Sequence, residues 1–128
     1  MSGAARTMLV FGIYVAVMGV LLVALPNLLL GLLGLPPTDE VWIRVVGVLA
    51  LVIAAFYLVA GRANLRPFFR LSLYTRAGVF LGFTALALAG LGSPMLILFG
   101  AVDLAGAAWT GWALRAERQG AIGGAPAM

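Results

Sequence analysis

The sequence predicts an all-α integral membrane protein: a bundle of four transmembrane helices with a short interfacial helix after the first span. Of its 128 residues, 64% are hydrophobic and only 9% are charged, whereas soluble domains are about 25% charged. A helix that crosses a bilayer needs about 20 apolar residues, and four uncharged or nearly uncharged stretches of that size follow one another. A second, soluble domain does not fit in the remaining length.

The four predicted spans cover residues 7–25, 41–60, 72–91 and 94–114. They form one transmembrane domain over residues 1–119, and residues 120–128 form a flexible tail, because this end is small, polar and without a periodic apolar face. A cleaved signal peptide is the alternative for the first span. Its apolar core would be shorter, about 7 to 15 residues, so we expect the first span to be retained.

Prolines and polar residues predict how the spans are connected. Pro26 suits the first turn of a helix, so Pro26–Gly34 is expected to form the short interfacial helix. Thr38 and the acids Asp39 and Glu40 are typical of a cap and an acidic first turn for the second span. Pro67 is expected to interrupt any helix before the third span.

The arginines predict the orientation. With both termini in the cytoplasm, seven of the eight arginines lie inside, as the positive-inside rule requires, and Arg44 is the exception. Anionic lipid headgroups then explain the net charge of +4 without a nucleic-acid partner. Membrane lipids are therefore the expected partners. Most of this charge lies in one connection, which could be a specific lipid or phosphate site or an ordinary topology anchor; its arginines are Arg62, Arg66, Arg70 and Arg76.

The chain contains no histidine, cysteine or lysine. This excludes disulfides, thiolate metal sites, histidine-ligated haem, histidine-based catalysis and a Schiff-base lysine. We therefore expect no catalytic residues, no metal site and no cofactor, and a role other than that of an enzyme. Met8, Met18 and Met95 are better interpreted as packing residues than as metal ligands.

Asp103 is the most informative single residue, because it lies near the middle of the fourth span. An ionised carboxylate at that depth costs about 2.5 to 3.5 kcal/mol on insertion scales, so it needs a partner or a proton. At helical spacing it shares a face with small or weakly polar residues, which predicts that it faces the bundle. These residues are Gly100, Gly106, Ala107 and Thr110.

Three side chains could meet Asp103: Arg44, Tyr14 and Thr84. At about 1.5 Å per residue, the two hydroxyls lie at a similar depth, while Arg44 lies nearer the outer surface and would have to reach inward. The cluster could be structural and fix the helix register, or it could mark a proton, ion or substrate path. The sequence leaves both open.

Small residues at helical spacing predict close contact between helices. Gly78 and Gly82 form a GxxxG pattern in the third span, and Gly100 and Gly106 lie on one side of the fourth. Such patterns let helices approach closely. Packing within the chain is the preferred interpretation; a homo-oligomer or another membrane protein is the alternative.

The chain resembles the small four-helix bacterial membrane proteins of the DoxX-like and BphX-like type, which are mostly uncharacterised. Three features carry the resemblance: the stretch from Pro26 to Pro36, Arg44 and Gly47 in WIRVVGVLALVIAAFYLVAGR, and Asp103 in GAVDLAGAAWTGWAL. The resemblance implies a bacterial inner (cytoplasmic) membrane protein. It draws attention to Arg44 and Asp103.

Three functions remain possible from the sequence. The first is a membrane scaffold or accessory subunit that acts through helix and lipid contacts. The second is a small transporter or proton-linked carrier that uses Asp103 with Arg44. The third, and weakest, is a quinone-associated redox subunit. Small multidrug transporters are excluded because the first span lacks an acid, and fluoride channels because their polar third span is missing.

Overall fold

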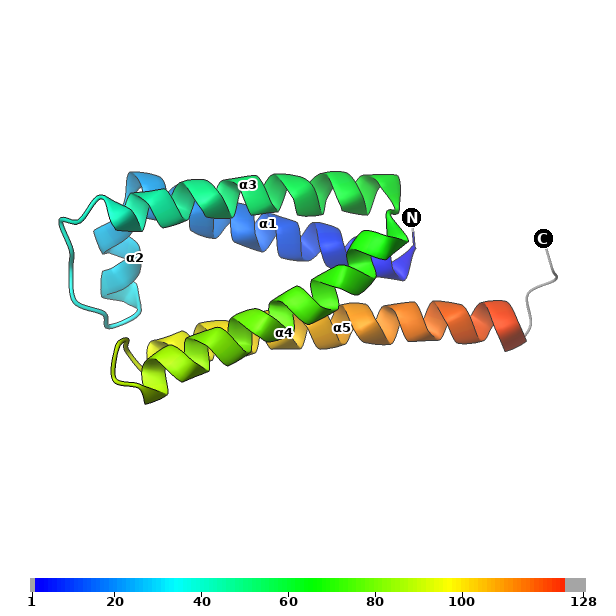
Figure 1. Cartoon of the computed structure of the whole chain (residues 1–128). Helices are drawn as coiled ribbons and strands as arrows, with labels where there is room; N and C mark the ends of the chain where they lie inside the picture. The colour runs from blue at the N-terminus through cyan, green and yellow to red at the C-terminus, as the bar shows by residue number, and fades with distance from the viewer. Residues whose placement is uncertain (1, 124–128) are drawn as a thin grey trace. The chain divides into compact units, whose positions relative to one another are not determined.

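A computed structural model describes residues 2–123 of the chain, and the side chains of residues 2–118. Within this range the protein is all-α, as predicted, and contains no β-strand. Five helices follow one another (Figure 1): α1 (Gly3–Ala24), α2 (Pro26–Leu32), α3 (Trp42–Ala63), α4 (Arg66–Leu88) and α5 (Met95–Gly123).

Four of these helices, all but α2, are long and apolar enough to cross a membrane. Large apolar side chains are exposed along all four, including Ile13 in α1, Phe56 in α3, Leu81 in α4 and Leu98 in α5. A soluble protein seldom exposes so much contiguous apolar surface. The chain is therefore a multi-pass membrane protein.

Two helix starts differ from the prediction. Pro67 does not interrupt a helix; it lies in the first turn of α4, which begins at Arg66 rather than Ser72. Proline is tolerated there because the first backbone N–H groups of a helix have no partner within it. The other difference is at α3, which begins at Trp42. The predicted cap residue Thr38 lies in the preceding loop, where its hydroxyl accepts a hydrogen bond from the Glu40 N–H.

The first and last helices extend beyond the predicted spans. The first helix begins at Gly3, before the span predicted from Thr7, and α5 continues to Gly123, beyond the predicted start of the tail at residue 120. Residues 124–128 of that predicted tail lie outside the described residues.

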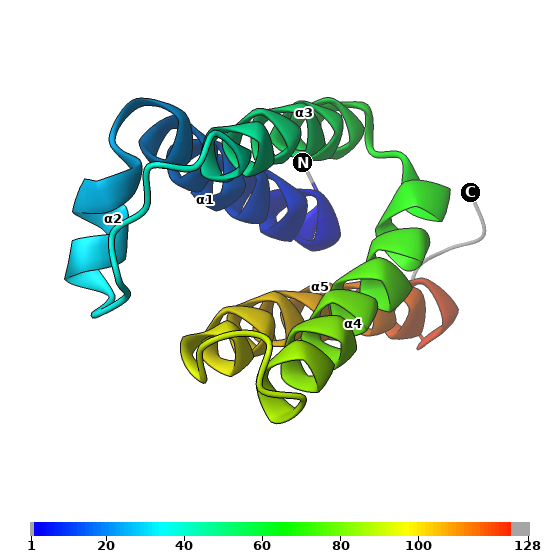
Figure 2. The same ribbon diagram turned by 60° about the vertical axis from the view of Figure 1, so that its left-hand side comes forward.

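The chain divides into two compact units. One contains residues 9–59, which are most of α1, α2 and most of α3. Here α1 and α3 lie side by side (Figure 2) and run in opposite directions, since Gly12 contacts Tyr57 and Leu58 whereas Gly19 lies against Gly47. A Cβ built on Gly47 would lie only 2.9 Å from the Gly19 carbonyl oxygen. The absence of side chains at these two glycines therefore allows the backbones to approach.

The other unit contains residues 2–8 and 60–123 of the described chain. Its main element is the pair formed by α4 and α5 (Figure 1). Close contact again occurs at a glycine, because a Cβ on Gly100 would lie 2.9 Å from the Phe80 Cα. A second glycine, Gly111, lies against Leu73.

Turns at either end of α4 use residues that tolerate positive φ. At the start, Asn64 has φ 53° and lies between α3 and α4; asparagine adopts this left-handed region more readily than most residues. At the end, Gly90 has φ 76°, and the Leu91 N–H donates to the Leu86 carbonyl. This is the hydrogen bond of a Schellman motif, and it reverses the chain toward α5.

The GxxxG pattern of α4 lies on an open face. A Cβ built on Gly78 or Gly82 would meet no atom of the described residues within 4 Å. Packing by these two glycines remains a prediction.

A pair of glycine substitutions should separate close contact from open surface. Gly47→Ala is expected to destabilise the protein, by about 1 to 3 kcal/mol, because the new methyl group meets backbone and side-chain atoms of α1. Gly78→Ala is the matched control. It should be neutral or stabilising by up to about 1 kcal/mol, and the measurement is unfolding in detergent micelles. Equal losses in both variants would contradict the contact between α1 and α3.

Candidate functional site

Arg76 is the centre of the best-defined polar cluster. It lies in the third turn of α4 and is only 2% exposed. A buried guanidinium is costly unless hydrogen-bond acceptors surround it. The acceptors around it therefore define the cluster.

Three helices supply these acceptors. Within α4, the Arg76 Nε donates to the Ser72 carbonyl at 3.3 Å, and Nη2 donates to the Ser72 hydroxyl at 3.0 Å. From α5, the Thr110 hydroxyl accepts from Nη2 at 2.9 Å. The Met8 sulfur of α1 lies 3.7 Å from the same nitrogen. Atoms of three helices therefore meet at one side chain.

The hydroxyls form a chain with a fixed direction. The Thr7 hydroxyl donates to the Ala4 carbonyl at 2.7 Å, which uses its single proton. Thr110 must then be the donor in the 2.7 Å contact between the Thr7 and Thr110 hydroxyls. The order runs from Arg76 to Thr110, then to Thr7, and ends on a backbone carbonyl. We call Arg76, Ser72, Thr110 and Thr7 the arginine–hydroxyl cluster.

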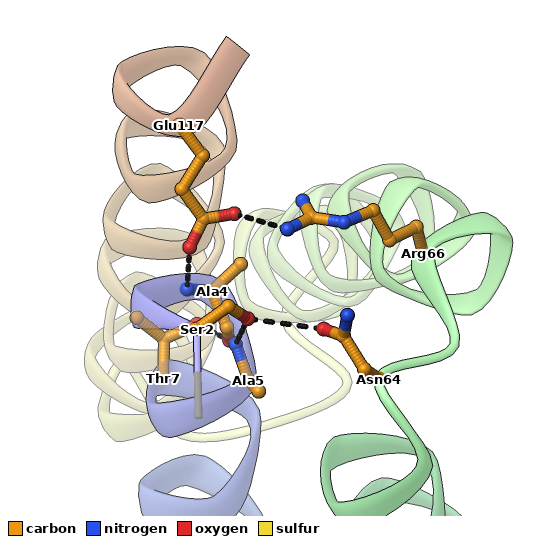
Figure 3. Close-up of polar contacts among 7 residues, drawn as sticks. All are labelled: Ser2, Ala4, Ala5, Thr7, Asn64, Arg66 and Glu117. Carbon is orange, nitrogen blue, oxygen red and sulfur yellow. Dashed lines mark hydrogen bonds and ion pairs between the residues drawn. The ribbon is translucent and has the colours of Figure 1, made fainter. Parts of the chain in front are cut away.

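A second set of polar contacts surrounds Glu117, near the end of α5 (Figure 3). Its carboxylate accepts a hydrogen bond from the Ala4 N–H at 2.9 Å and forms a salt bridge with Arg66 at 2.7 Å. A carboxylate at a helix N-terminus is favourable because it meets unpaired N–H groups and the positive end of the helix dipole. Glu117 therefore joins the first turns of α1 and α4 to α5.

Ser2 completes the N-terminal contacts of α1. Its hydroxyl accepts a hydrogen bond from the Ala5 N–H at 3.1 Å, as an N-cap does, and donates to the Asn64 side chain at 3.0 Å (Figure 3). The start of α1 is thereby attached to the turn between α3 and α4.

Asp103 lies on α5, within the candidate span Met95–Arg118, and is half-buried. The positive charge of Arg76 acts electrostatically on its carboxyl group. Of the predicted polar cluster, Thr84 lies in the same unit, and its hydroxyl is buried without a hydrogen-bond partner among the described residues. Arg76 was not among the side chains that the sequence predicted to meet Asp103.

Arg44 and Tyr14 belong to the other unit. The Arg44 guanidinium donates to the Val23 carbonyl of α1, and the Tyr14 ring lies 5.6 Å from that of Phe11. Contacts of Arg44 or Tyr14 with Asp103 remain predictions.

The four arginines predicted to bind headgroups occupy different surroundings. Arg62 and Arg70 are exposed, Arg66 pairs with Glu117, and Arg76 is buried in the arginine–hydroxyl cluster. Arg76 therefore contacts protein hydroxyls. Headgroup binding by the other three remains a prediction.

The glycines of α5 can be placed individually. Gly100 lies against Phe80, and Gly106 is half-buried. Within the described part of the chain, no group of three or more acidic, histidine or cysteine residues could hold a metal ion.

Sequence reasoning missed Ser72, Thr7 and Glu117. One signal was present: Ser72 and Arg76 are four residues apart and share a helix face once α4 is extended through Pro67. Glu117 gave no such signal, because its partners are far away in the sequence.

The arginine–hydroxyl cluster makes a testable contribution to stability. Thr110→Val keeps the shape of the side chain but removes the acceptor for Arg76 and the donor to Thr7. We expect a loss of about 1 to 3 kcal/mol, measured by unfolding in detergent micelles. Thr84→Val is the control, since its hydroxyl has no partner among the described residues, and it should be neutral or stabilising. A neutral Thr110→Val would contradict the cluster.

Comparison with known proteins adds no relative to this picture. No family model, no curated protein and no solved structure matches the chain.

Proposed function

We propose that the protein is a membrane scaffold or accessory subunit that acts through helix and lipid contacts. The observation that carries this proposal is that the buried hydroxyls around Arg76 are used in bonds between helices. The directed chain from Arg76 ends on the Ala4 carbonyl. Groups committed in this way hold a structure together and are poorly suited to bind and release a substrate.

The open face of α4 supports a role in association. Gly78 and Gly82 lie on it, and no atom in the described part of the chain is within 4 Å of a Cβ built on either glycine. In lipid, helices associate through close packing at small residues rather than through the hydrophobic effect. A second copy of the chain or another membrane protein is the partner that this face would suit.

The proposal includes a membrane location and a protein family. The arginine distribution favours cytoplasmic termini, and the likeness of Arg44, Gly47 and Asp103 to the DoxX-like pattern favours a bacterial inner membrane protein.

A small proton-linked carrier is the second candidate. It is favoured by the half-buried carboxyl of Asp103 within an apolar helix and by the charge of Arg76 acting on it. Ionisable groups inside a membrane often mark a proton or ion path.

Cross-linking through α4 tests the scaffold role. The chain has no cysteine, so a Gly78→Cys variant carries a single thiol. Oxidation in native membranes, followed by mass spectrometry, is expected to link it to a second copy or to one membrane protein. Leu98→Cys is the control and should link less: it is exposed on α5 and lies about 200° around that helix from Gly100, which contacts α4. Equal or no cross-linking at both positions would contradict association through this face.

Proton flux separates the two functions. Liposomes that contain the purified protein and a pH-sensitive dye should be as proton-tight as empty liposomes if the protein is a scaffold, and Asp103→Asn should change nothing. Asp39→Asn, which removes an acid from the loop before α3, is the control. A flux that Asp103→Asn lowers about tenfold or more while Asp39→Asn does not would contradict the scaffold and favour the carrier; a tenfold change corresponds to about 1.4 kcal/mol in the barrier.

A further inference from the structure

One side of the α4–α5 pair carries two exposed arginines and two exposed aromatic residues. On α4 these are Arg70 and Tyr74, and on α5 they are Trp112 and Arg115. Tyr74 is 77% exposed and Trp112 is 68% exposed. Each arginine shares a helix face with its aromatic neighbour, because residues three or four apart lie one above the other. We call these four residues the arginine–aromatic surface.

The contacts between α4 and α5 put the two arginines at one level. Leu73 lies against Gly111, with 3.7 Å between its Cδ2 and a built Cβ, and the helices run in opposite directions. Arg70 precedes Leu73 by three residues, and Arg115 follows Gly111 by four. Both arginines therefore lie about 5 to 6 Å from that contact, toward the end of the pair that is remote from the Gly90 turn.

The aromatic residues lie one step further along the pair. Tyr74 directly follows Leu73, and Trp112 directly follows Gly111. Both therefore lie near the level of the contact itself. The order along the helix pair is two arginines first and two aromatic rings next.

Helical periodicity puts all four residues on the same side of the pair. The first turns of α1 cover one side: Met8 meets Ser72 and Arg76 on α4, and Thr7 meets Thr110 on α5. At about 100° per residue, Ser72 and Arg76 lie to one side of Leu73 around the axis of α4, the side that faces α1. Arg70 and Tyr74 lie to the other side.

The same holds for α5. Relative to Gly111, Thr110 is turned toward α1, while Trp112 and Arg115 are turned away from it. The arginine–aromatic surface is therefore on the side of the pair opposite to the first turns of α1.

The two acids of the helix pair both lie on the side that the first turns of α1 cover. Asp103 and Glu117, the acids of α5, are both turned from Gly111 in the same sense as Thr110, and Glu117 contacts Ala4 of α1. Among the described residues, Arg70 and Arg115 form no salt bridge. The arginine–aromatic surface thus has a positive charge with no acid beside it.

We propose that this surface binds the headgroup of an anionic phospholipid. The planar guanidinium groups match phosphate oxygens in geometry and charge, and tyrosine and tryptophan favour the headgroup level of a bilayer. The apolar side chains further along, such as Leu81 at 67% exposure, suit an acyl chain. The inference rests on the membrane role proposed above, and it adds Arg115 and the two aromatic residues to the predicted headgroup arginines.

Lipid-selective quenching of Trp112 tests the proposal. Trp42→Phe and Trp109→Phe in the full chain leave Trp112 as the single tryptophan. The protein is placed in phosphatidylcholine vesicles in which a minor fraction of lipid carries brominated acyl chains, either phosphatidylglycerol or phosphatidylcholine. We expect phosphatidylglycerol to be enriched at Trp112, and each arginine to contribute about fivefold.

Substitutions in the same background identify the residues responsible. Arg70→Gln with Arg115→Gln should abolish the enrichment. Arg6→Gln with Arg118→Gln is the matched control: both arginines are exposed and lie in the same unit, neither is among the predicted headgroup arginines, the same charge is lost, and the enrichment should remain. Arg70→Lys with Arg115→Lys keeps the charge and should keep most of the preference, which verifies that loss in the glutamine variant does not reflect misfolding.

Three results would overturn the lipid site: unchanged enrichment in the Arg70→Gln, Arg115→Gln variant, equal loss in the control pair, or displacement of the lipid by millimolar inorganic phosphate. Each of these leaves the membrane role intact as long as brominated phosphatidylcholine quenches Trp112. Absence of quenching by either lipid would instead contradict the membrane role itself.

Discussion

The buried guanidinium of Arg76 imposes the constraint on which the described structure of residues 2–8 and 60–123 depends. A charge removed from solvent needs acceptors at short range, and Arg76 finds them on α4 and, through Thr110, on α5. Because Thr110 in turn donates to Thr7, the first turns of α1 are included. Three helices therefore share one register at this point, and a shift of any of them would leave a polar group without its partner.

The same helix pair presents two different sides because its polar residues are distributed around both helices. The side covered by the start of α1 contains Arg76 and Glu117, whose charges are engaged with protein atoms. The opposite side contains Arg70 and Arg115, which are exposed. A difference of two positions, as between Arg115 and Glu117, is enough to separate a surface that can meet lipid from an internal contact, since each residue turns the helix by about 100°.

The unit formed by residues 9–59 is held together differently. Gly19 and Gly47 bring the backbones of α1 and α3 into direct contact, and the Arg44 side chain donates to the Val23 carbonyl. Helices in lipid gain little from the hydrophobic effect when they associate, so close van der Waals contact at small residues is the main source of stability. This explains why the chain combines so many glycines with long apolar helices.

The sequence by itself determined the all-α class, the four apolar helices and the position of the short helix that begins at Pro26, because composition and the length of apolar runs are local properties. The inward face of α5 that includes Thr110 was also predictable from helical spacing. The prediction that Pro67 interrupts a helix was wrong, because proline can either interrupt a helix or lie in its first turn. Only the tertiary structure decided that Arg76 is buried and that Glu117 meets the Ala4 N–H. The hydrogen bond between Glu117 and Ala4 joins residues that are 113 positions apart. No local pattern specifies which distant backbone group an isolated acid will meet.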